Sequence, residues 1–476
     1  MSEDKAKTCA PDMLENVTFD ELTIGQSAEL RRRLTEREIT LFAAVSGDVN
    51  PAHLNKDYAQ QSPFHGVIGH GMWSGALISA VLGTQLPGPG TVYIAQDLHF
   101  TKPVHVNEEI TARVTVTEKH EGKHVVKLAC LCTNSKGETV LEGKATVLAP
   151  TQKLRVARPQ VPELILPHDH YRGVMDYARQ LGRIKVAVVH PVQDNVITAV
   201  LEAIDEQLMD PILIGPAARI KQACSACGVE SSRFTIIDAE HSHAAAVKAA
   251  QMAAAGEVDA IMKGSLHSDE LLGAIVSSAS GLRTERRVSH AYIMDIPTYS
   301  KPLIITDAAI NIAPTLEEKA DICRNAIDLW HVLFAHLPRD PKVAILSAVE
   351  TVTSRMPSTL DAAALCKMAD RGQISGGVLD GPLAFDNAIS PHAAQDKGIT
   401  SLVAGDADIL LVPNIETGNA LAKQMIHLGQ AEAAGIVLGA RVPVILTSRA
   451  DSTRTRLFSC AVAIALAAAR RQGKVK

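Results

Sequence analysis

The sequence predicts two folded units of different class, an α+β unit followed by a larger α/β unit with a mostly parallel sheet. The chain has 476 residues, which is too long for one average domain of roughly 100 to 200 residues. One helical segment followed by strands fills the first 150 residues, whereas strands and helices alternate in the remainder. A stretch rich in Pro and basic residues at 151–168 is typical of a semi-rigid linker between the two.

The first unit is expected over residues 17–150, after a polar, flexible N-terminus at 1–16. A helix rich in Gly, Ala and apolar residues is predicted over 69–86. Segments rich in β-branched residues and separated by turn residues predict strands at 92–100, 109–119, 124–134 and 138–148. One buried helix packed on an antiparallel meander is an α+β arrangement.

The second unit is expected over residues 169–476. Apolar runs predict strands at 185–190, 211–214, 234–237, 260–263, 303–306, 343–346, 376–379, 409–412 and 444–447. Helices are predicted at 241–256, 316–336, 359–371 and 418–434, and a buried C-terminal helix at 457–469. Near-continuous apolar strands that alternate with helices imply a parallel sheet covered on both faces.

Composition narrows the function classes. The formal net charge is −5 and aromatic residues make up 3%, so neither nucleic acid nor an anionic membrane surface is an expected partner. The eight cysteines are dispersed, which disfavours a disulfide framework, and the lone pair Cys224 and Cys227 has no second pair at zinc spacing. With no apolar leader or membrane-spanning stretch, a cytoplasmic enzyme without a metal is expected.

The run 42–59 carries the clearest chemical signal. Asp48 and His53 lie on either side of the Asn50-Pro51 turn. Pro51 fixes its own φ and biases Asn50 toward an extended backbone, so the segment is not a plain helix. A converging carboxylate and imidazole can share one water molecule and act as general base and acid.

This run resembles the signature of the MaoC-like, R-specific enoyl-CoA hydratases, which have a hot-dog fold. The segments 70–72 and 85–90 extend the resemblance to about residues 17–148, and Ala52 replaces a larger aliphatic residue. The resemblance implies hydration of trans-2-enoyl-CoA to (R)-3-hydroxyacyl-CoA. Asp48 and His53 would activate water, Asn50 would brace the turn, backbone N–H groups near Gly71 would hold the thioester oxyanion, and Ser79 would lie close by. The alternatives are a thioesterase relative, or a domain that only binds acyl-CoA or drives oligomerisation.

Polar residues and Gly follow apolar strands at 380–388, 405–419 and 444–452 in the second unit. The carboxyl ends of parallel strands are where ligands bind in open α/β sheets. Helices that begin after Gly418 and Ser452 would direct free N–H groups at an anion, and Arg449 supplies a planar cation suited to phosphate. Neither a P-loop nor a dinucleotide-binding Gly motif is present.

These segments, with Lys263-Gly264 and 294–311, resemble the phosphate acyltransferase family over about 170–470, and its butyryl branch more than its acetyl branch. The resemblance implies acyl transfer between coenzyme A and inorganic phosphate. Ser448 would hydrogen-bond the tetrahedral intermediate and Arg449 would bind phosphate. It also implies a two-lobed architecture like that of the isocitrate and isopropylmalate dehydrogenases. Further substrate contacts are expected from Asn414, Gly418 and Asn419.

The base for the thiol is left open. Thr455 stands where the acetyl branch has an Asp, and Asp451 could substitute for it. Arg283, Arg287 and Lys263 are candidates for phosphate or CoA contacts, although a basic cluster is more often a solvated surface. The sequence therefore predicts a bifunctional acyl-CoA enzyme without a permanently bound cofactor. Its substrates are coenzyme A thioesters and phosphate, and by resemblance it forms a homo-oligomer.

Overall fold

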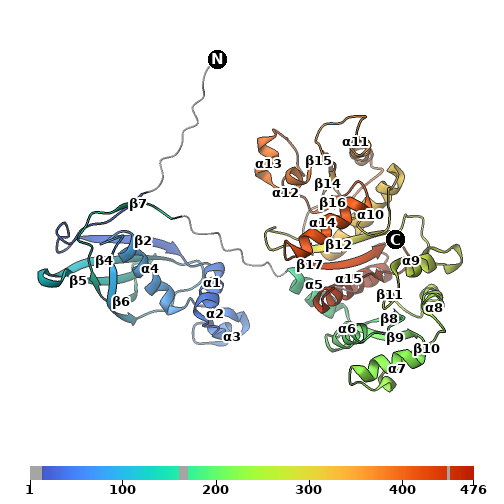
Figure 1. The fold of residues 1–476 in the computed structure, drawn as a ribbon, viewed down its shortest axis with the longest axis horizontal. Helices are drawn as coiled ribbons and strands as arrows, with labels where there is room; N and C mark the ends of the chain where they lie inside the picture. Colours follow the sequence, from blue (N-terminus) through green and yellow to red (C-terminus); the bar gives the residue numbers. More distant parts are fainter. Residues whose placement is uncertain (1–12, 160–169, 448–450, 476) are drawn as a thin grey trace, which may run out of the picture. The chain divides into compact units, whose positions relative to one another are not determined.

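The computed structural model describes residues 13–159, 170–447 and 451–475 (Figure 1). The chain divides into two compact units, Met1–Leu166 and Pro167–Lys476, and each is described by itself. Among the described helices, none is long and apolar enough to cross a membrane.

The first unit contains a five-stranded antiparallel sheet with the strand order β2-β4-β5-β6-β3. Its strands are β2 (Ser27–Arg33), β3 (Val92–Phe100), β4 (Glu109–His120), β5 (Val125–Asn134) and β6 (Thr139–Leu148). The last four lie where they were predicted, but β3 pairs with β6 and is not next to β4. Strand β2 was not predicted, because its four charged residues mask the alternation typical of a strand.

The central helix α4 (Gly71–Thr84) packs on this sheet, against β2, β3, β4 and β5. Trp73, Leu77 and Val81 on α4 are buried and belong to the core of the unit. Before it come α1 (Glu36–Ser46), α2 (Pro51–Leu54) and α3 (Lys56–Gln61), and the 3-10 turn η1 (Glu121–Lys123) joins β4 to β5. A single buried helix on an antiparallel sheet agrees with the predicted α+β class.

The two ends of the first unit are joined by a short sheet. Strand β1 (Met13–Glu15) pairs antiparallel with β7 (Arg155–Ala157). The Asn16 side-chain amide donates to the carbonyls of Pro89 and Gln152 at 3.1 and 2.9 Å. The stretches predicted as a flexible N-terminus and as a linker therefore each contribute a strand, because each supplies the other's backbone partners.

The second unit is built on an eleven-stranded sheet with the order β10-β9-β8-β11-β18-β17-β12-β13-β16-β14-β15. Its strands are β8 (Ile184–Val189), β9 (Met209–Gly215), β10 (Thr235–Asp238), β11 (Ala260–Lys263), β12 (Ser289–Asp295), β13 (Leu303–Thr306), β14 (Lys342–Leu346), β15 (Val378–Leu383), β16 (Ile409–Leu411), β17 (Glu432–Leu438) and β18 (Val444–Ile445).

Most neighbouring strands are parallel, as predicted, but the centre of the sheet is not. Strand β12 is antiparallel to both β13 and β17, and β17 is antiparallel to β18. The sheet thus consists of two parallel halves that run in opposite directions, and the terminal strand β18 returns to the first half beside β11. The sequence analysis missed β12 and β17, and assigned the start of β17 to a helix.

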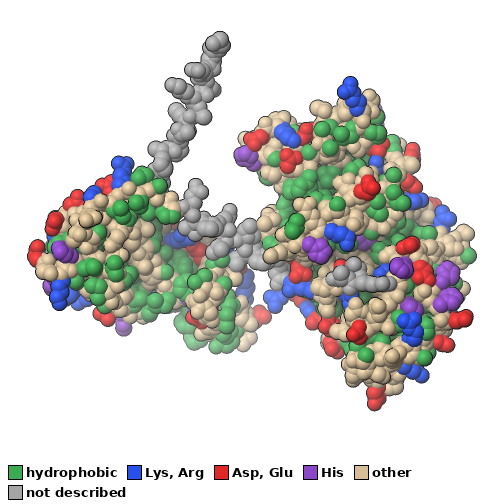
Figure 2. Space-filling model, in the orientation of Figure 1, with side chains coloured by type: hydrophobic (Ala, Val, Ile, Leu, Met, Phe, Trp, Pro, Cys, Tyr) green, Lys and Arg blue, Asp and Glu red, His purple; other side chains and the backbone are tan. Residues whose placement is uncertain are grey.

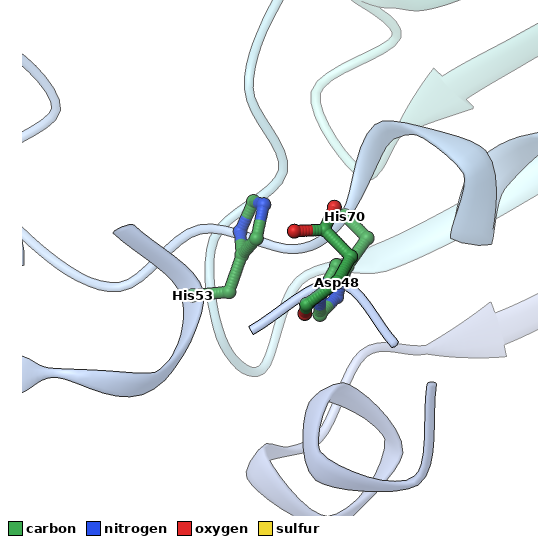
Figure 3. A group of neighbouring side chains, drawn as sticks. All are labelled: Asp48, His53 and His70. Carbon is green, nitrogen blue, oxygen red and sulfur yellow. The ribbon is translucent and has the colours of Figure 1, made fainter. Parts of the chain in front are cut away.

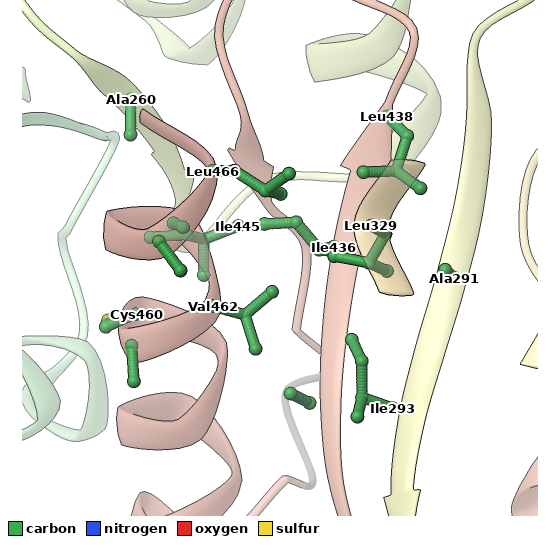
Figure 4. Close-up of a cluster of buried hydrophobic side chains, with 14 of the residues drawn as sticks. Ala260, Ala291, Ile293, Leu329, Ile436, Leu438, Ile445, Cys460, Val462 and Leu466 are labelled. Carbon is green, nitrogen blue, oxygen red and sulfur yellow. The ribbon is translucent and has the colours of Figure 1, made fainter. Parts of the chain in front are cut away.

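Helices cover both faces of this sheet (Figure 1). They are α5 (His170–Leu181), α6 (Asp194–Asp205), α7 (Ala217–Ala226), α8 (Ser242–Ala254), α9 (Ser268–Val276), α10 (Leu316–Leu333), α11 (Pro357–Asp370), α12 (Phe385–Ile389), α13 (Pro391–Asp396), α14 (Ile415–His427) and α15 (Thr453–Arg471), with 3-10 turns η2 (Ser231–Arg233) and η3 (Ser278–Ser280). The predicted buried C-terminal helix is α15. Figure 4 shows its Val462 and Leu466 directed at Ile436 of β17, with Leu329 of α10 beside them.

Candidate active sites

The loop after α1 carries the first predicted pair. Helix α1 ends at Gly47, whose φ of 76° is in the left-handed region that favours glycine. Asn50 caps α2, because its Oδ1 accepts a hydrogen bond from the Ala52 N–H at 3.1 Å. The Asp48 carboxylate accepts from the Asn50 N–H at 3.2 Å. These local bonds hold the short segment between Asp48 and His53 in one conformation.

The side chains of Asp48 and His53 face each other in Figure 3. Asp48 is exposed and His53 is half-buried. The Nδ1 atom of His53 lies 2.8 Å from the backbone carbonyl oxygen of Ile68. Since a carbonyl oxygen only accepts, Nδ1 carries the hydrogen, and Nε2 of the neutral ring is left with a lone pair. His53 can therefore take a proton from water at Nε2.

His70 completes this group, and the sequence analysis did not assign it a role. It is buried immediately before α4, and its Nε2 donates to the backbone carbonyl of Asp48 at 2.9 Å. Its ring centroid lies 4.0 Å from that of His53 and 5.0 Å from that of Phe42. The sequence offered one signal for a role of His70. It directly precedes a Gly-rich helix, and the Asp/His pair lies upstream of it.

The N-terminus of α4 meets this group at Gly71. The His70 side chain does not cap the helix, so N–H groups of the first turn remain available to an anion. A side chain at Gly71 would meet the Phe100 ring at 3.1 Å, which explains the glycine. Ser79 lies on an exposed part of α4, about 12 Å further along its axis. The contacts described for this unit bring Ser79 to neither residue of the pair.

Exposed apolar side chains lie close to the pair in the sequence. Val45, Val49 and Leu54 next to it in the sequence are 83%, 70% and 42% exposed, and Tyr58 on α3 is 54% exposed. Figure 2 shows the apolar surface over α2 and α3. Exposed apolar side chains on the elements that carry a polar pair suit a substrate with an acyl chain.

The second candidate site is a cavity of about 660 Å³ over the centre of the larger sheet. Strand β12 and helix α14 supply much of its wall, together with the end of β11 and the two residues that follow β18. Its lining residues are Lys263, Leu266, His267, Ser268, His290, Tyr292, Ala309, Ile415, Glu416, Asn419, Lys423, Leu446 and Thr447. It therefore lies where the two parallel halves of the sheet meet, the kind of switch point at which α/β sheets bind ligands.

Lys263 and Thr447 both line this cavity and are in contact with each other. The Nζ atom of Lys263, which is 7% exposed, donates to the Thr447 carbonyl oxygen at 3.4 Å. Ser448 and Arg449 follow Thr447 directly but lie outside the described residues.

The carboxylate of Asp451, which could substitute for the Asp of the acetyl branch, lies near the cavity. Burial raises the pKa of Tyr292 in the cavity wall to about 12, and the Asp451 charge adds to this shift. Thr455 lies in the first turn of α15, where its N–H and Oγ1 each lie 3.1 Å from Oγ of the capping residue Ser452. Thr455, which stands where the acetyl branch has an Asp, is therefore bonded to the capping residue of α15.

His290 on β12 is a residue of this cavity that the sequence analysis missed. Its side chain is fully buried, and neither ring nitrogen forms a hydrogen bond with the described residues. Burial lowers its pKa to about 4, partly opposed by the Leu446 backbone. His290 is therefore neutral at pH 7. The only signal in the sequence was a histidine within an apolar run, which is more often a core residue.

Helix α14 places its predicted residues at two different cavities. It begins at Ile415 with Asn414 as its cap, and not after Gly418 as predicted, because Asn414 Oδ1 accepts from the Thr417 N–H at 2.9 Å. Asn419 lines the cavity of Lys263 and donates to the Ala308 carbonyl at 3.1 Å. Asn414 instead lines an adjacent cavity of about 600 Å³.

Arg283 and Arg287 lie at a third cavity, of about 590 Å³, together with Glu285, Glu317 and Glu318. Arg287 donates to Asn311 Oδ1 at 2.7 Å and forms an ion pair with Glu318 at 3.1 Å. The structure thus does not bring these arginines to the cavity of Lys263. Carboxylates next to them also disfavour a phosphate contact.

Two family models match this chain, one in each of its two compact units. Residues 240–464 match the family model described as phosphate acetyl/butaryl transferase, and residues 21–134 match the MaoC like domain. A phosphate acetyltransferase from Rhizobium meliloti is 56% identical over 305 residues, which are 64% of this chain and 96% of that protein. A phosphate butyryltransferase from Clostridium acetobutylicum is 41% identical over 283 residues, 60% of this chain and 93% of that one. These identities do not favour the butyryl branch that the sequence analysis preferred.

Two solved structures were each found to be similar to a part of this chain. A branched-chain phosphotransacylase from Enterococcus faecalis V583 has a TM-score of 0.53 and 29% identity, covering 60% of this chain and 99% of that one. The R-hydratase PhaJ1 from Pseudomonas aeruginosa has 42% identity and a TM-score of 0.32, covering 33% of this chain and 99% of that one. The chain therefore belongs to the phosphate acetyl/butyryl transferase family and carries a MaoC-like domain as its first unit.

Proposed function

We propose that this chain is a bifunctional acyl-CoA enzyme. The first unit hydrates trans-2-enoyl-CoA to (R)-3-hydroxyacyl-CoA, and the second exchanges an acyl group between coenzyme A and inorganic phosphate. The observation that carries the first activity is the facing pair Asp48 and His53, held beside the uncapped start of α4. The second activity is supported by family membership and by the polar cavity at Lys263.

In the hydratase site, His53 and Asp48 hold one water molecule between them. His53 removes a proton from this water at Nε2 while the oxygen attacks C3 of the enoyl thioester. Negative charge then moves to the thioester oxygen, where N–H groups at the start of α4 stabilise it. A proton returned to C2 by the same pair completes the addition of water.

Replacing Asp48 by Asn and His53 by Ala tests this mechanism in the full chain. Each variant should lose about 10²- to 10⁴-fold in the rate of crotonyl-CoA hydration, measured as loss of the ultraviolet absorbance of the conjugated thioester. His99→Gln, on the exposed strand β3, is the matched control and should retain full activity. A wild-type protein without hydration activity would favour a first unit that only binds acyl-CoA or drives oligomerisation.

In the transferase site, phosphate attacks the thioester carbonyl and coenzyme A leaves as a thiolate, which then takes up a proton. We assign the tetrahedral intermediate to Ser448 and the attacking phosphate to Arg449. Lys263, buried in the wall of the cavity, adds a positive charge to the proposed site. Asp451 is the proposed partner of the thiol proton, because its charge reaches Tyr292 in the cavity wall.

Phosphate-dependent release of coenzyme A from acetyl-CoA and butyryl-CoA, followed with a thiol reagent, tests the second activity. Ser448→Ala and Arg449→Gln should each lower kcat/KM at least about 100-fold, since each removes a contact to developing charge. Arg283→Gln, at the separate cavity, should leave the rate within about twofold. No phosphate-dependent release from either thioester would contradict the proposed transferase.

We further propose that neither activity needs a permanently bound cofactor, since coenzyme A thioesters and phosphate are substrates. The two halves of the larger sheet would form two lobes, as in the isocitrate-type dehydrogenases, with the cavity of Lys263 between them. A homo-oligomer is expected from the family resemblance, and light scattering of the purified protein measures its size.

A further inference from the structure

The hydratase group contains three potential metal ligands. Asp48, His53 and His70 each offer one ligand atom, and these atoms lie within 4.8 Å of one another. Around a tetrahedral zinc ion with bonds of about 2.0 to 2.1 Å, ligand atoms are about 3.4 Å apart. Zinc binding therefore requires side-chain rotations that bring the three atoms to this spacing, and the exposed Asp48 side chain is free to make its part of them.

The hydrogen bonds of the two rings leave one lone pair on each. His53 donates Nδ1–H to the Ile68 carbonyl, and His70 donates Nε2–H to the Asp48 carbonyl. The unprotonated atoms are therefore Nε2 of His53 and Nδ1 of His70. Histidines that bind metals typically donate their other N–H to a backbone carbonyl in this way.

A second observation indicates that His70 is a ligand of this site. Its side chain is 3% exposed, and its Nδ1 has no hydrogen-bond partner among the described residues. A buried acceptor without a donor is unfavourable, because it has lost its hydrogen bonds to water. A bound cation would satisfy it.

We propose that Asp48, His53 and His70 form a binding site for a divalent transition metal of the Zn²⁺ class. Two imidazoles and one carboxylate are ligands that zinc uses, and an exposed side of the site leaves room for water. The metal takes the lone pair of His53 and the carboxylate that activate water in the proposed hydratase. Zn²⁺ is thus a reversible inhibitor of hydration, a consequence that rests on the proposed function, whereas binding does not.

Titration of the metal-free full chain with Co²⁺, followed by visible absorption, tests binding without any activity. The wild type should give d–d bands of a nitrogen- and oxygen-ligated ion, and Zn²⁺ should displace them. His70→Gln keeps a donor for the Asp48 carbonyl but removes the lone pair, so we expect at least about tenfold weaker binding. His99→Gln should bind as the wild type does. Equal affinity in His70→Gln would overturn the proposal.

Two further measurements show whether weaker binding by His70→Gln results from loss of a ligand or from misfolding. The midpoint of thermal unfolding checks that His70→Gln is folded, and Asp48→Asn, altered at an exposed position, should weaken Co²⁺ binding independently.

Zn²⁺ should inhibit crotonyl-CoA hydration with a half-inhibitory concentration at least about tenfold lower for the wild type than for His70→Gln, and EDTA should reverse the inhibition. A wild type that binds Co²⁺ but does not hydrate crotonyl-CoA refutes the proposed function alone. Hydration with no Co²⁺ binding refutes the metal site alone.

Discussion

At the scale of the residue, His290 makes the most specific prediction. Burial lowers its pKa to about 4, whereas an exposed histidine titrates near about 6.5. Between these two pKa values the His290 side chain is protonated in the unfolded chain and neutral in the folded chain. The free energy of unfolding therefore decreases as the pH falls from about 6.5 to about 4. His290→Leu should remove this loss, which amounts to about 3 kcal/mol at pH 4 relative to pH 7. Urea unfolding at both pH values measures it. The exposed His392→Gln is the control, and an unchanged pH dependence in His290→Leu would contradict a neutral buried ring.

The sequence located Asp48 and His53 because their spacing around a Pro turn is local. It missed His70 and His290, since each acquires its role only from contacts with distant segments. His70 is 22 residues from its partner Asp48, and His290 reaches the cavity only because β12 alternates its side chains between the two faces. Arg287 illustrates the reverse case, because its carboxylate partner Glu318 comes from α10 and could not be predicted from the local sequence.

At the scale of the element, α14 depends on one glycine for its position. A side chain at Gly418 would meet the Asp307 carbonyl oxygen at 2.6 Å and Val412 Cγ2 at 2.8 Å. Gly418→Ala should therefore push α14 away from the 307–308 backbone and break the bond from Asn419 to Ala308. We expect destabilisation by about 1 to 3 kcal/mol and a larger loss in the transferase rate. Chemical denaturation and the phosphate-dependent assay measure the two effects. Ala at the solvent-facing Gly273 of α9, where a side chain meets nothing, is the matched control.

Elements were predictable where apolar periodicity was undisturbed, as in β3, β11 and β13, whose bounds the sequence analysis matched. The missed strands carry charged or polar residues, and their status as strands comes from pairing with neighbours. Strand β12 runs between β13 and β17, so its polar His290 and Asp295 are covered by other elements. The reversal of direction at the centre of the sheet is likewise a property of long-range pairing, which periodicity does not contain.

At the scale of the whole molecule, the two units have separate hydrophobic cores, which predicts separable unfolding. Leu77 of α4 lies in the core of the first unit and Phe458 of α15 in that of the second. Leu77→Ala should cost about 2 to 5 kcal/mol and lower the unfolding transition that accompanies loss of hydration. Phe458→Ala should cost about 3 to 5 kcal/mol and lower the transition that accompanies loss of acyl transfer. Differential scanning calorimetry with residual activities after heating assigns each transition. If either variant shifted both transitions equally, the units would unfold as one cooperative body, and the separation of their cores would not extend to their stability.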